Sequence, residues 1–375
     1  MRINSMHTLN ARCPLGEYGE QMEQWEHPID TGVVPDDDTA FDVIVVGGGP
    51  GGSAAAAYNA LNGCRVLLLE KGVWPRDKPC GDAVGGKSLS HVEELGVLPM
   101  VESTPHYVVD SIVFGSPNGS EVRVMLPKES YEEKGLLSGY ALPRVQFDYM
   151  LFKRATEMVL EAGGSVIQGF SVSDVAVDDG KLGQRVVGVS GKAGGARSEE
   201  PELSFSAPLT VGAGGYNCPV SRKITEVHDE PHKDNEHFCG GYREYWENVE
   251  GLGDSEGPIE IHFIDEVLPG YFWLFPVKEG VVNVGCGMLI SEQRKQKGKK
   301  KSLKQYRGGS SRSIPDSKRG LRMLPWSQSR RRGGSSRAAL LGRRRRRTSP
   351  EEWRWPGPWP LGMQQALSTP SAGKV

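Results

Sequence analysis

The segment FDVIVVGGGPGGSAAAAY, residues 41–58, constrains the fold of this chain more than any other stretch. A run of Val and Ile leads directly into the spaced glycines Gly47, Gly49 and Gly52, and an alanine-rich stretch typical of a helix follows. A strand that turns sharply into a helix is the first half of a Rossmann-like unit. The segment therefore predicts an α/β fold with a parallel sheet covered by helices.

The same glycines and a later acidic residue predict a dinucleotide site that also includes Gly51. Gly47 permits the tight turn, Gly49 lets the backbone approach a pyrophosphate, and Gly52 lets helix and strand pack closely. The first turn of the helix faces the phosphates with its N–H groups. Glu70 ends the next predicted strand, 18 residues after Gly52, and can accept hydrogen bonds from ribose hydroxyls. A chance glycine-rich turn does not explain strand, helix and acid in register.

Further elements are expected downstream of this unit. A hairpin is predicted around residues 117–119, and a helix over residues 145–162. Strands are expected near residues 165–177, 184–190 and 208–213. Between residues 236 and 290 the alternation of four β-rich segments predicts an antiparallel sheet.

These patterns divide the chain into two domains and two terminal segments. The nucleotide-binding domain is expected to comprise residues 41–106 and 141–235, and an antiparallel-sheet domain residues 107–140 and 236–305. Residues 1–40 are polar and are expected to form a flexible extension.

Cysteine spacing and hydropathy limit the environment of the protein. The six cysteines form no C-x-x-C pair and no zinc spacing, so free thiols in a reducing cytoplasm are favoured over a disulfide framework, and no metal site is expected. The first residues lack the apolar run of a signal peptide, and no stretch approaches the ~20 apolar residues of a membrane span. We expect a cytoplasmic protein, soluble or peripheral to the membrane.

The segment ALPRVQFDYMLFKRA places Arg144 at a strand end, before a helix that carries Phe147, Asp148 and Leu151. Taken alone, this pattern is also consistent with a capping arginine and core residues. In this position it resembles the second half of the FAD site in flavoproteins of the aromatic-hydroxylase type, in which the arginine lies over the cofactor. VGAGGYNCPVSRKI resembles a later G-A-D-G segment of that superfamily, with Gly214 where aspartate is usual.

Two further motifs narrow the resemblance. RDKPCGDAVGG contains Cys80 and Gly81 on an expected loop after the Glu70 strand. YFWLFPVKEGVVNVG places alternating aromatic side chains on one face of an expected strand. Together they resemble the geranylgeranyl reductase family, and the loop and YREYWENV are most similar to its archaeal digeranylgeranylglycerophospholipid reductases. The resemblance covers about residues 41–305.

The resemblance implies a Rossmann-like FAD-binding domain of the aromatic-hydroxylase type with an antiparallel-sheet substrate domain. It also implies that FAD is bound by the glycine loop, Glu70, Cys80, Gly81, Arg144 and the backbone near Val172.

The implied reaction is the saturation of geranylgeranyl double bonds on an archaeal membrane glycerophospholipid precursor. Cys80 would be the catalytic residue, supplying a proton itself or through a water. A ferredoxin, a deazaflavin and NAD(P)H remain open as the electron donor. An isoprenoid chain requires an apolar wall, which the resemblance assigns to Tyr271, Trp273, Phe275 and Pro276.

Other interpretations stay open beside this one. Without the family, a core strand is the favoured interpretation of the aromatic strand, and Cys80 is consistent with a small loop residue. A related FAD monooxygenase or halogenase and a chlorophyll-pathway geranylgeranyl reductase are alternative enzymes. A nucleic-acid-binding module built around the arginine-rich tail is an alternative of a different class.

The composition changes abruptly after residue 305. From residue 306 onward 16 Lys and Arg stand against 3 Asp and Glu, whereas the residues before have 29 against 44. Five consecutive arginines, residues 343–347, are typical of a basic nucleic-acid-binding arm. The family's third FAD segment, G-D-A-A-G-x-x-x-P-x-x-G-x-G, is expected after the antiparallel domain and is absent from the sequence.

A displaced reading frame accounts for both observations. The codons GGC GAC GCC GCC GGC encode G-D-A-A-G, and in a displaced frame they contain CGA CGC CGC CGG, which encode four arginines. Reading on from Gly342, Pro350 can yield the proline, and the TGG codons of Trp353 and Trp355 force the two glycines. We therefore expect residues 306–375 to be an aberrant basic tail read out of frame, and we expect no nucleic-acid partner.

Overall fold

The computed structural model describes residues 40–134, 139–180, 183–195, 197–232, 238–247, 255–265, 267–289 and 291–292. The expected N-terminal extension, apart from residue 40, and the expected basic tail lie outside the described residues.

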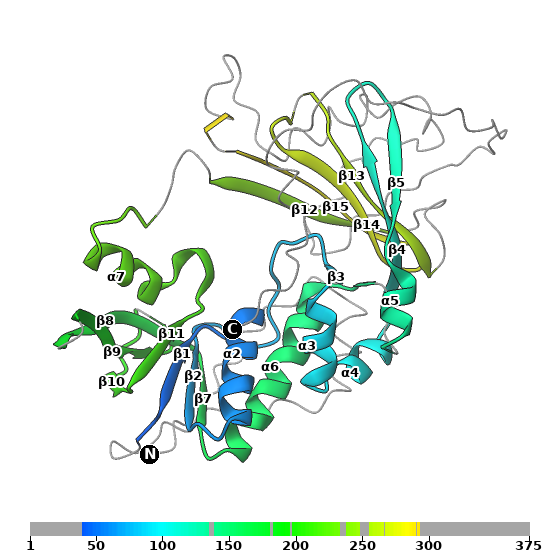
Figure 1. Cartoon of the computed structure of the whole chain (residues 1–375). Helices are drawn as coiled ribbons and strands as arrows, with labels where there is room; N and C mark the ends of the chain where they lie inside the picture. The colour runs from blue at the N-terminus through cyan, green and yellow to red at the C-terminus, as the bar shows by residue number, and fades with distance from the viewer. Residues whose placement is uncertain are drawn as a thin grey trace, which may run out of the picture. The chain divides into compact units, whose positions relative to one another are not determined.

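A four-stranded parallel sheet carries the glycine-rich segment (Figure 1). Its strand order is β11-β1-β2-β7, and every pair in it is parallel. The helices α2 and α6 pack together and against this sheet. The bounds are β1 Val43–Val46, α2 Pro50–Leu61, β2 Val66–Glu70, α6 Arg144–Glu161, β7 Ser165–Gln168 and β11 Leu209–Gly212.

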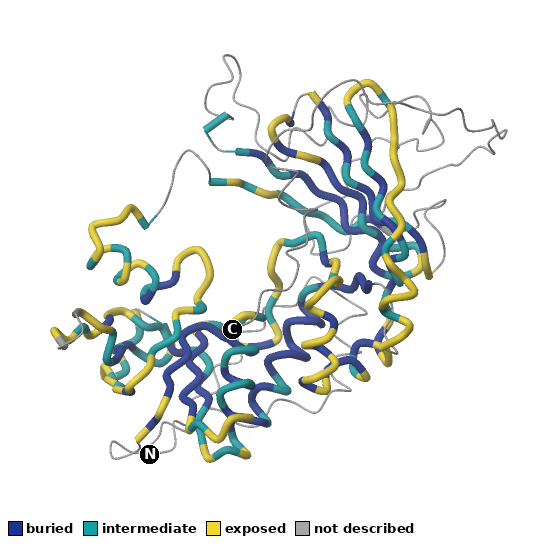
Figure 2. The backbone as a smooth tube through the Cα atoms, in the orientation of Figure 1, coloured by how far each residue is buried: buried dark blue, intermediate teal, exposed yellow. Residues whose placement is uncertain are grey.

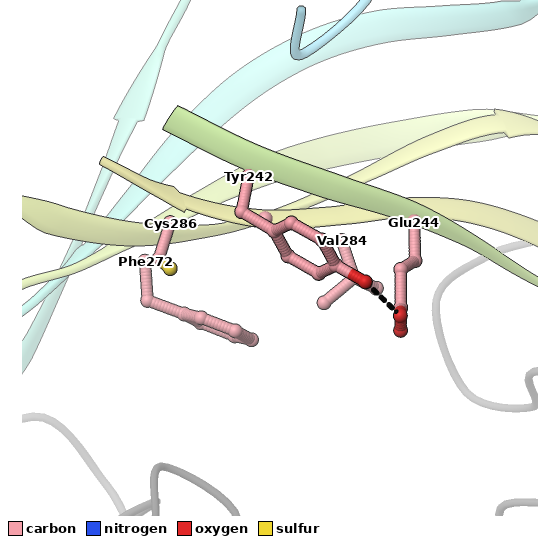
Figure 3. A pocket seen from close by; sticks show the side chains of 6 residues that line it. Tyr242, Glu244, Phe272, Val284 and Cys286 are labelled. Carbon is pink, nitrogen blue, oxygen red and sulfur yellow. Dashed lines mark hydrogen bonds between the residues drawn. The ribbon is translucent and has the colours of Figure 1, made fainter. Parts of the chain in front are cut away.

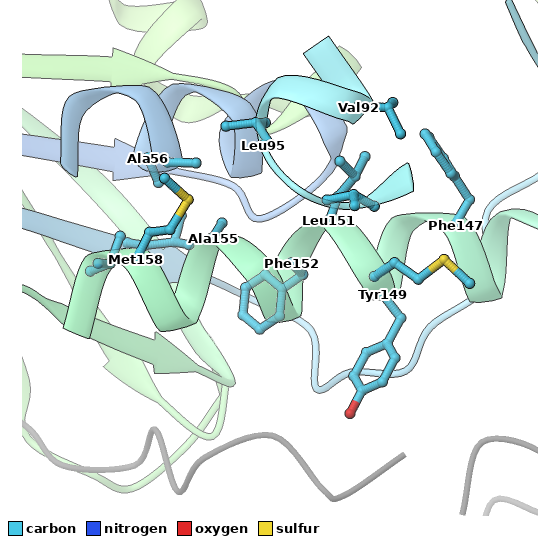
Figure 4. Close-up of a cluster of buried hydrophobic side chains, with 14 of the residues drawn as sticks. Ala56, Val92, Leu95, Phe147, Tyr149, Leu151, Phe152, Ala155 and Met158 are labelled. Carbon is cyan, nitrogen blue, oxygen red and sulfur yellow. The ribbon is translucent and has the colours of Figure 1, made fainter. Parts of the chain in front are cut away.

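The two faces of this sheet are buried in different cores because side chains alternate along a strand. Val43, Val45 and Leu68 face α2 and α6, whose residues Phe147, Leu151, Phe152 and Met158 belong to the same cluster (Figure 4). Ile44, Val46 and Leu69 belong to a second cluster with residues of β8 and β9. Both faces being covered explains the continuous apolar runs of β1 and β2.

A three-stranded antiparallel sheet, in the order β10-β9-β8, covers the second face. The strand β9 ends at Ala193 and β10 begins at Glu202, so these two strands flank residues 194–201. The helix α7 follows β11 after a short 3-10 turn at Gly215–Asn217. The bounds are β8 Phe170–Gly180, β9 Gly183–Ala193, β10 Glu202–Ser206 and α7 Pro219–Val227.

The third sheet has the order β12-β15-β14-β13-β4-β6-β3, with β5 paired to β4. All its pairs are antiparallel except β13 with β4, which run parallel, so the sheet expected to be antiparallel is mixed. The strand β3 also joins this sheet, although its residues precede the segment expected to do so. The bounds are β3 Ala83–Gly85, β4 Tyr107–Gly115, β5 Glu121–Met125, β6 Gly139–Ala141, β12 Cys239–Glu247, β13 Glu256–His262, β14 Tyr271–Lys278 and β15 Val281–Leu289.

Three short helices lie between these strands in the sequence, and the extent of burial differs from strand to strand. The helices are α3 Ser88–Glu94, α4 Leu98–Glu102 and α5 Lys128–Glu132. Figure 2 shows that β1, β2 and most of α6 are buried, whereas β5 is exposed along its length. No disulfide joins the described cysteines.

Candidate functional site

The glycine loop between β1 and α2 has the geometry that the sequence predicts. Gly47 has a φ of 109°, and a Cβ there would lie 2.5 Å from the carbonyl oxygen of Ala213. A Cβ on Gly52 would lie 1.6 Å from the carbonyl oxygen of Gly47. Side chains are therefore excluded at both positions. By contrast, Gly49 caps α2 in an extended conformation, and the space beside Gly51 is open within 4 Å.

Glu70 lies beside this loop and is buried at the end of β2. Its Oε2 accepts a hydrogen bond from the backbone N–H of Gly48 at 2.6 Å, and its Oε1 accepts one from Gly72 at 2.7 Å. The carboxylate predicted to bind ribose thus also joins the glycine loop to the segment after β2. These two hydrogen bonds hold the backbone that a dinucleotide would contact.

Arg76, which was not among the residues expected at the site, supplies a positive charge beside the same loop. Its Nε lies 3.4 Å from Oε1 of Glu70, and its Nη2 lies 3.5 Å from where a Cβ on Gly49 would be. The guanidinium also stacks over the ring of Trp74, 4.2 Å from the ring centroid, and Trp74 stacks on Phe152 of α6. The glycine loop lets the backbone approach closely, and the N-terminus of α2 and the guanidinium of Arg76 attract negative charge. These features fit the diphosphate of a dinucleotide.

Arg144 begins α6 and is held by Asp148, one turn further along the helix. Its Nη2 donates to Oδ2 of Asp148 at 2.8 Å, its Nε donates to Oδ1, and Asp148 is fully buried. Burial works to lower the pKa of the guanidinium, but the hydrogen bond and charge of Asp148, and the interaction with Cys80, raise it. Arg144 therefore remains a cation, and Cys80 is near enough to help raise its pKa. Phe147 and Leu151 of the same motif are core residues, as the alternative interpretation holds.

The loop that carries Cys80 lies against one face of the third sheet. The carbonyl oxygen of Cys80 accepts a hydrogen bond from Nδ2 of Asn283 on β15 at 2.6 Å. A Cβ on Gly81 would lie 2.6 Å from the ring of Phe275 on β14. The structure thus brings together the two motifs that carried the family resemblance, although about 200 residues separate them in the sequence.

An ion pair fastens the start of this loop to β12. Arg243 donates from Nη2 to Oδ1 of Asp77 at 2.6 Å and to the carbonyl oxygen of Lys78 at 3.2 Å. The guanidinium lies 4.3 Å from the ring centroid of Tyr245, its neighbour on the same face. The loop is therefore attached at both its beginning and its end.

Asp82, at the end of the loop, is the buried centre of a polar network. Its carboxylate accepts hydrogen bonds from the hydroxyl of Tyr245, from Nδ2 of Asn283 at 2.7 Å and from the backbone N–H of Arg144 at 3.3 Å. Burial raises the pKa of Asp82 to about 6, and these hydrogen bonds, with the charge of Arg243, limit the rise. The sequence motifs of the family resemblance include Asp82, Tyr245 and Asn283. Their spacing in the sequence does not indicate that these three side chains lie together.

The aromatic residues of β14 share one face of the sheet with Asn283. The ring centroids of Tyr271 and Trp273 are 6.0 Å apart, and those of Trp273 and Phe275 are 6.5 Å apart. Trp273 is buried and donates from Nε1 to Oδ1 of Asn283 at 2.9 Å, while Tyr271 is 43% exposed. Strand alternation places Pro276 on the opposite face, apart from the other three expected wall residues.

That opposite face carries a small apolar pocket, lined by residues of β12, β14 and β15 (Figure 3). The hydroxyl of Tyr242 donates a hydrogen bond to Glu244 there, and the remainder of the lining is Phe272, Val284, Gly285 and Cys286. Val172, expected near the cofactor, lies on β8 and packs against the core between the small sheet and the parallel sheet.

Two structural features are absent from the described residues. These residues contain no helix long and apolar enough to cross a membrane. In the same part of the chain, no group of three His, Cys, Asp or Glu residues is placed to hold a metal ion.

Two family models match the sequence. The FAD binding domain matches residues 40–237, and the geranylgeranyl reductase catalytic domain matches residues 239–319. The first match covers the glycine loop, Glu70, Cys80 and Arg144, and the second covers the aromatic strand. The expected cofactor, FAD, and the expected fold class are therefore confirmed.

The chain is also similar to individual proteins, two in sequence and one in structure. The chain is 32% identical to digeranylgeranylglycerophospholipid reductase 1 of Methanopyrus kandleri over 67% of this chain and 59% of that protein. It is 28% identical to menaquinone reductase of Mycobacterium tuberculosis over 69% of this chain and 57% of that protein. A geranylgeranyl bacteriochlorophyll reductase-like structure from Thermoplasma acidophilum superposes with a TM-score of 0.57 at 24% identity, over 74% of this chain and 63% of that one. The chain thus spans somewhat more than half the length of these two curated relatives.

Proposed function

Because the chain belongs to the FAD-binding flavoproteins of the geranylgeranyl reductase family, we propose that it saturates the double bonds of geranylgeranyl chains on a membrane glycerophospholipid. The observation that carries this proposal is the contact between the Cys80 loop and the aromatic face. Gly81 packs against Phe275, and Asn283 binds the carbonyl of Cys80. The name of the Methanopyrus relative supports the choice of lipid.

The cofactor would be held by the glycine loop and the residues around it. The N-terminus of α2 and the cation of Arg76 would face the diphosphate, and Glu70 the ribose. Bound FAD, once reduced, supplies a hydride. The proposed contacts are Gly47, Gly49, Gly51, Gly52, Glu70, Cys80, Gly81, Arg144 and the backbone near Val172.

Cys80 is proposed to supply the proton that completes the reduction of each double bond. The proton leaves Sγ, directly or through a water, for one alkene carbon as the other carbon gains a hydride. The sulfur is left with a negative charge, which the guanidinium of Arg144 stabilises through its interaction with the Cys80 side chain. Arg144 stays charged because Asp148 holds it.

The aromatic face would orient the substrate and exclude water. An isolated alkene is unreactive and offers no group for hydrogen bonding, so alignment must contribute much of the rate. Tyr271, Trp273 and Phe275 present a continuous row of rings for an isoprenoid chain. Pro276 supports this wall from the other face of the strand.

The test uses the full chain and a frame-restored version, each loaded with FAD, reduced with dithionite and given a geranylgeranyl glycerophospholipid. We expect each reduced bond to add the mass of two hydrogens to the lipid. Cys80→Ser should slow the reduction by about a hundredfold, as expected for loss of a general acid, and leave FAD affinity nearly unchanged. Protein that takes up no FAD, or equal loss of reduction and FAD binding in Cys80→Ser, would contradict the proposal.

Other substrates and reactions are distinguished in the same assay. A menaquinone is a second candidate because of the Mycobacterium relative, and it is supplied in parallel with the phospholipid. Oxygen consumption with a hydroxylated or halogenated product would identify a monooxygenase or halogenase instead. Reduction of a chlorophyll-type geranylgeranyl ester in preference to the phospholipid would identify the pigment-pathway enzyme.

The electron donor and the location are also proposed. Ferredoxin, a deazaflavin and NAD(P)H are compared as donors by their rates of flavin reduction. The protein is proposed to be cytoplasmic and to meet its lipid at the membrane face. High-salt or carbonate washing should then release it from membranes, whereas recovery only in detergent would count against peripheral attachment.

A further inference from the structure

The amide of Asn283 lies between the Cys80 loop and the aromatic strand. Its side chain is fully buried, and each of its polar atoms has a partner. Nδ2 donates to the carbonyl oxygen of Cys80 at 2.6 Å and to Oδ2 of Asp82 at 2.7 Å, and Oδ1 accepts from Nε1 of Trp273 at 2.9 Å. A primary amide is suited to this junction because it donates twice and accepts as well.

The loop conformation depends on contacts of this kind. Asp82 has a φ of 71°, a left-handed conformation that few residues other than glycine adopt, although aspartate adopts it more often than most. Its carboxylate is held by Tyr245, Asn283 and the backbone of Arg144, and its carbonyl accepts a hydrogen bond from the N–H of Leu142. The backbone at Asp82, two residues after Cys80, is therefore held by these contacts in a conformation that it would not favour alone.

We infer that Asn283 is a positioning residue that sets the place of Cys80 relative to the aromatic face. Asn283 stands directly opposite Phe275 in the register of β14 and β15, so it is fixed to the strand that carries the rings. One amide thus places both the loop that bears the thiol and the ring of Trp273. The inference rests on the proposed function, because the relative position of Cys80 and Trp273 affects the reaction only if a substrate binds between them.

A chemical test measures the position of Cys80 without any lipid or turnover. The full chain, with and without FAD, is treated with iodoacetamide, and the alkylation of Cys80 is followed by mass spectrometry relative to that of Cys64. Asn283→Leu keeps the size of the side chain and removes all three hydrogen bonds. It should raise the relative alkylation rate of Cys80 about tenfold, the change expected from losing one buried hydrogen bond or more.

Two further variants separate positioning from general damage. Trp273→Phe keeps an aromatic ring but removes the Nε1 donor, and it should raise Cys80 alkylation about threefold. Ser111→Ala is the matched control, because Ser111 is buried in the same sheet but bonds to Arg123 and Asp110. It should alkylate like the parent chain.

The outcomes decide the inference separately from the function. Unchanged Cys80 alkylation in folded Asn283→Leu overturns it, and if that variant fails to fold, unchanged alkylation in Trp273→Phe overturns it. In the lipid assay Asn283→Leu should lower kcat about tenfold, because the thiol is displaced from the double bond that it protonates. If no lipid is reduced but alkylation responds as expected, the proposed function fails while the attachment of the loop by Asn283 stands.

Discussion

At the scale of single residues, the site depends on buried charges whose partners are far away in the sequence. Asp82 is the clearest case, because burial raises the pKa of its carboxyl from 3.8 to about 6. The folded chain therefore binds a proton at Asp82 more tightly than the unfolded chain does. The stabilisation this provides is complete below the unfolded pKa and is lost as the pH rises through about 6.

Asp82→Asn should remove this pH dependence. The unfolding free energy of the parent minus that of the variant should fall by on the order of 3 kcal/mol between about pH 4 and about pH 7.5. Urea denaturation at both pH values measures it. Asp174→Asn, which changes an exposed aspartate on β8, is the control and should follow the parent at both. A difference that does not change with pH would show that Asp82 titrates as an ordinary carboxyl.

Arg76 is the second residue-scale case, because its charge is held beside the glycine loop by Glu70 and Trp74. Arg76→Gln should weaken FAD binding by about tenfold to a hundredfold, the range for a lost charge-assisted hydrogen bond. Fluorescence titration of FAD measures the affinity. Arg65→Gln removes the same charge at the other end of β2 and should bind FAD like the parent. Equal affinities in all three chains would place the diphosphate away from Arg76.

At the scale of elements, the packing of β14 on β15 decides where the rings lie. A Cβ on Gly285 would come within 2.1 Å of the Trp273 ring and 2.5 Å of the carbonyl oxygen of Tyr242. A Cβ on Gly287, two residues on and on the same face, would meet its nearest atom at 3.6 Å. Two glycines of one strand thus differ sharply in the space around them.

Gly285→Ala should therefore displace the indole and lower the unfolding free energy by about 1–3 kcal/mol, the usual cost of overpacking. Gly287→Ala should change it by less than about 1 kcal/mol. Urea denaturation measures the free energies, and near-ultraviolet circular dichroism reports the displaced tryptophan. If both variants behave alike, the Trp273 ring does not lie over Gly285.

At the scale of the whole molecule, we propose that the segment completing the FAD site is encoded but read in the wrong frame. The geranylgeranyl reductase match extends into the tail expected from residue 306, but it ends at residue 319, before the arginines at residues 343–347. The codons allowed for residues 342–355 can be re-read as G-D-A-A-G-x-x-x-P-x-x-G-x-G. Both observations support the proposal, and the tail lies outside the described residues.

Resequencing the gene should reveal one inserted or deleted base before Gly342 that restores this segment. The frame-restored chain should bind FAD more tightly than the chain with the arginine tail, because a third segment would contribute to the cofactor site. Any affinity of the tail for RNA should be weak and should fall steeply with salt. Arginine codons that cannot be re-read in this way would refute the frame hypothesis. They would instead favour a basic nucleic-acid-binding arm.

The sequence by itself determined the features that depend on short-range sterics and periodicity. The turn at Gly47, the close approach at Gly52 and the acid at Glu70 are consequences of local chain geometry, so their spacing predicted the first βαβ unit and its dinucleotide site. Alternation likewise predicted that Tyr271, Trp273 and Phe275 share a face. FAD and the fold class, implied by the family motifs, were confirmed by the family match.

Only the tertiary structure decided what surrounds Cys80. Asp82 meets Tyr245 and Asn283 across 163 and 201 residues, and Arg76 reaches the glycine loop over the ring of Trp74. The parallel pairing of β13 with β4 and the extra strand β3 also depend on such contacts. Burial of a polar side chain demands a partner, but local sequence carries no information on which distant strand supplies it.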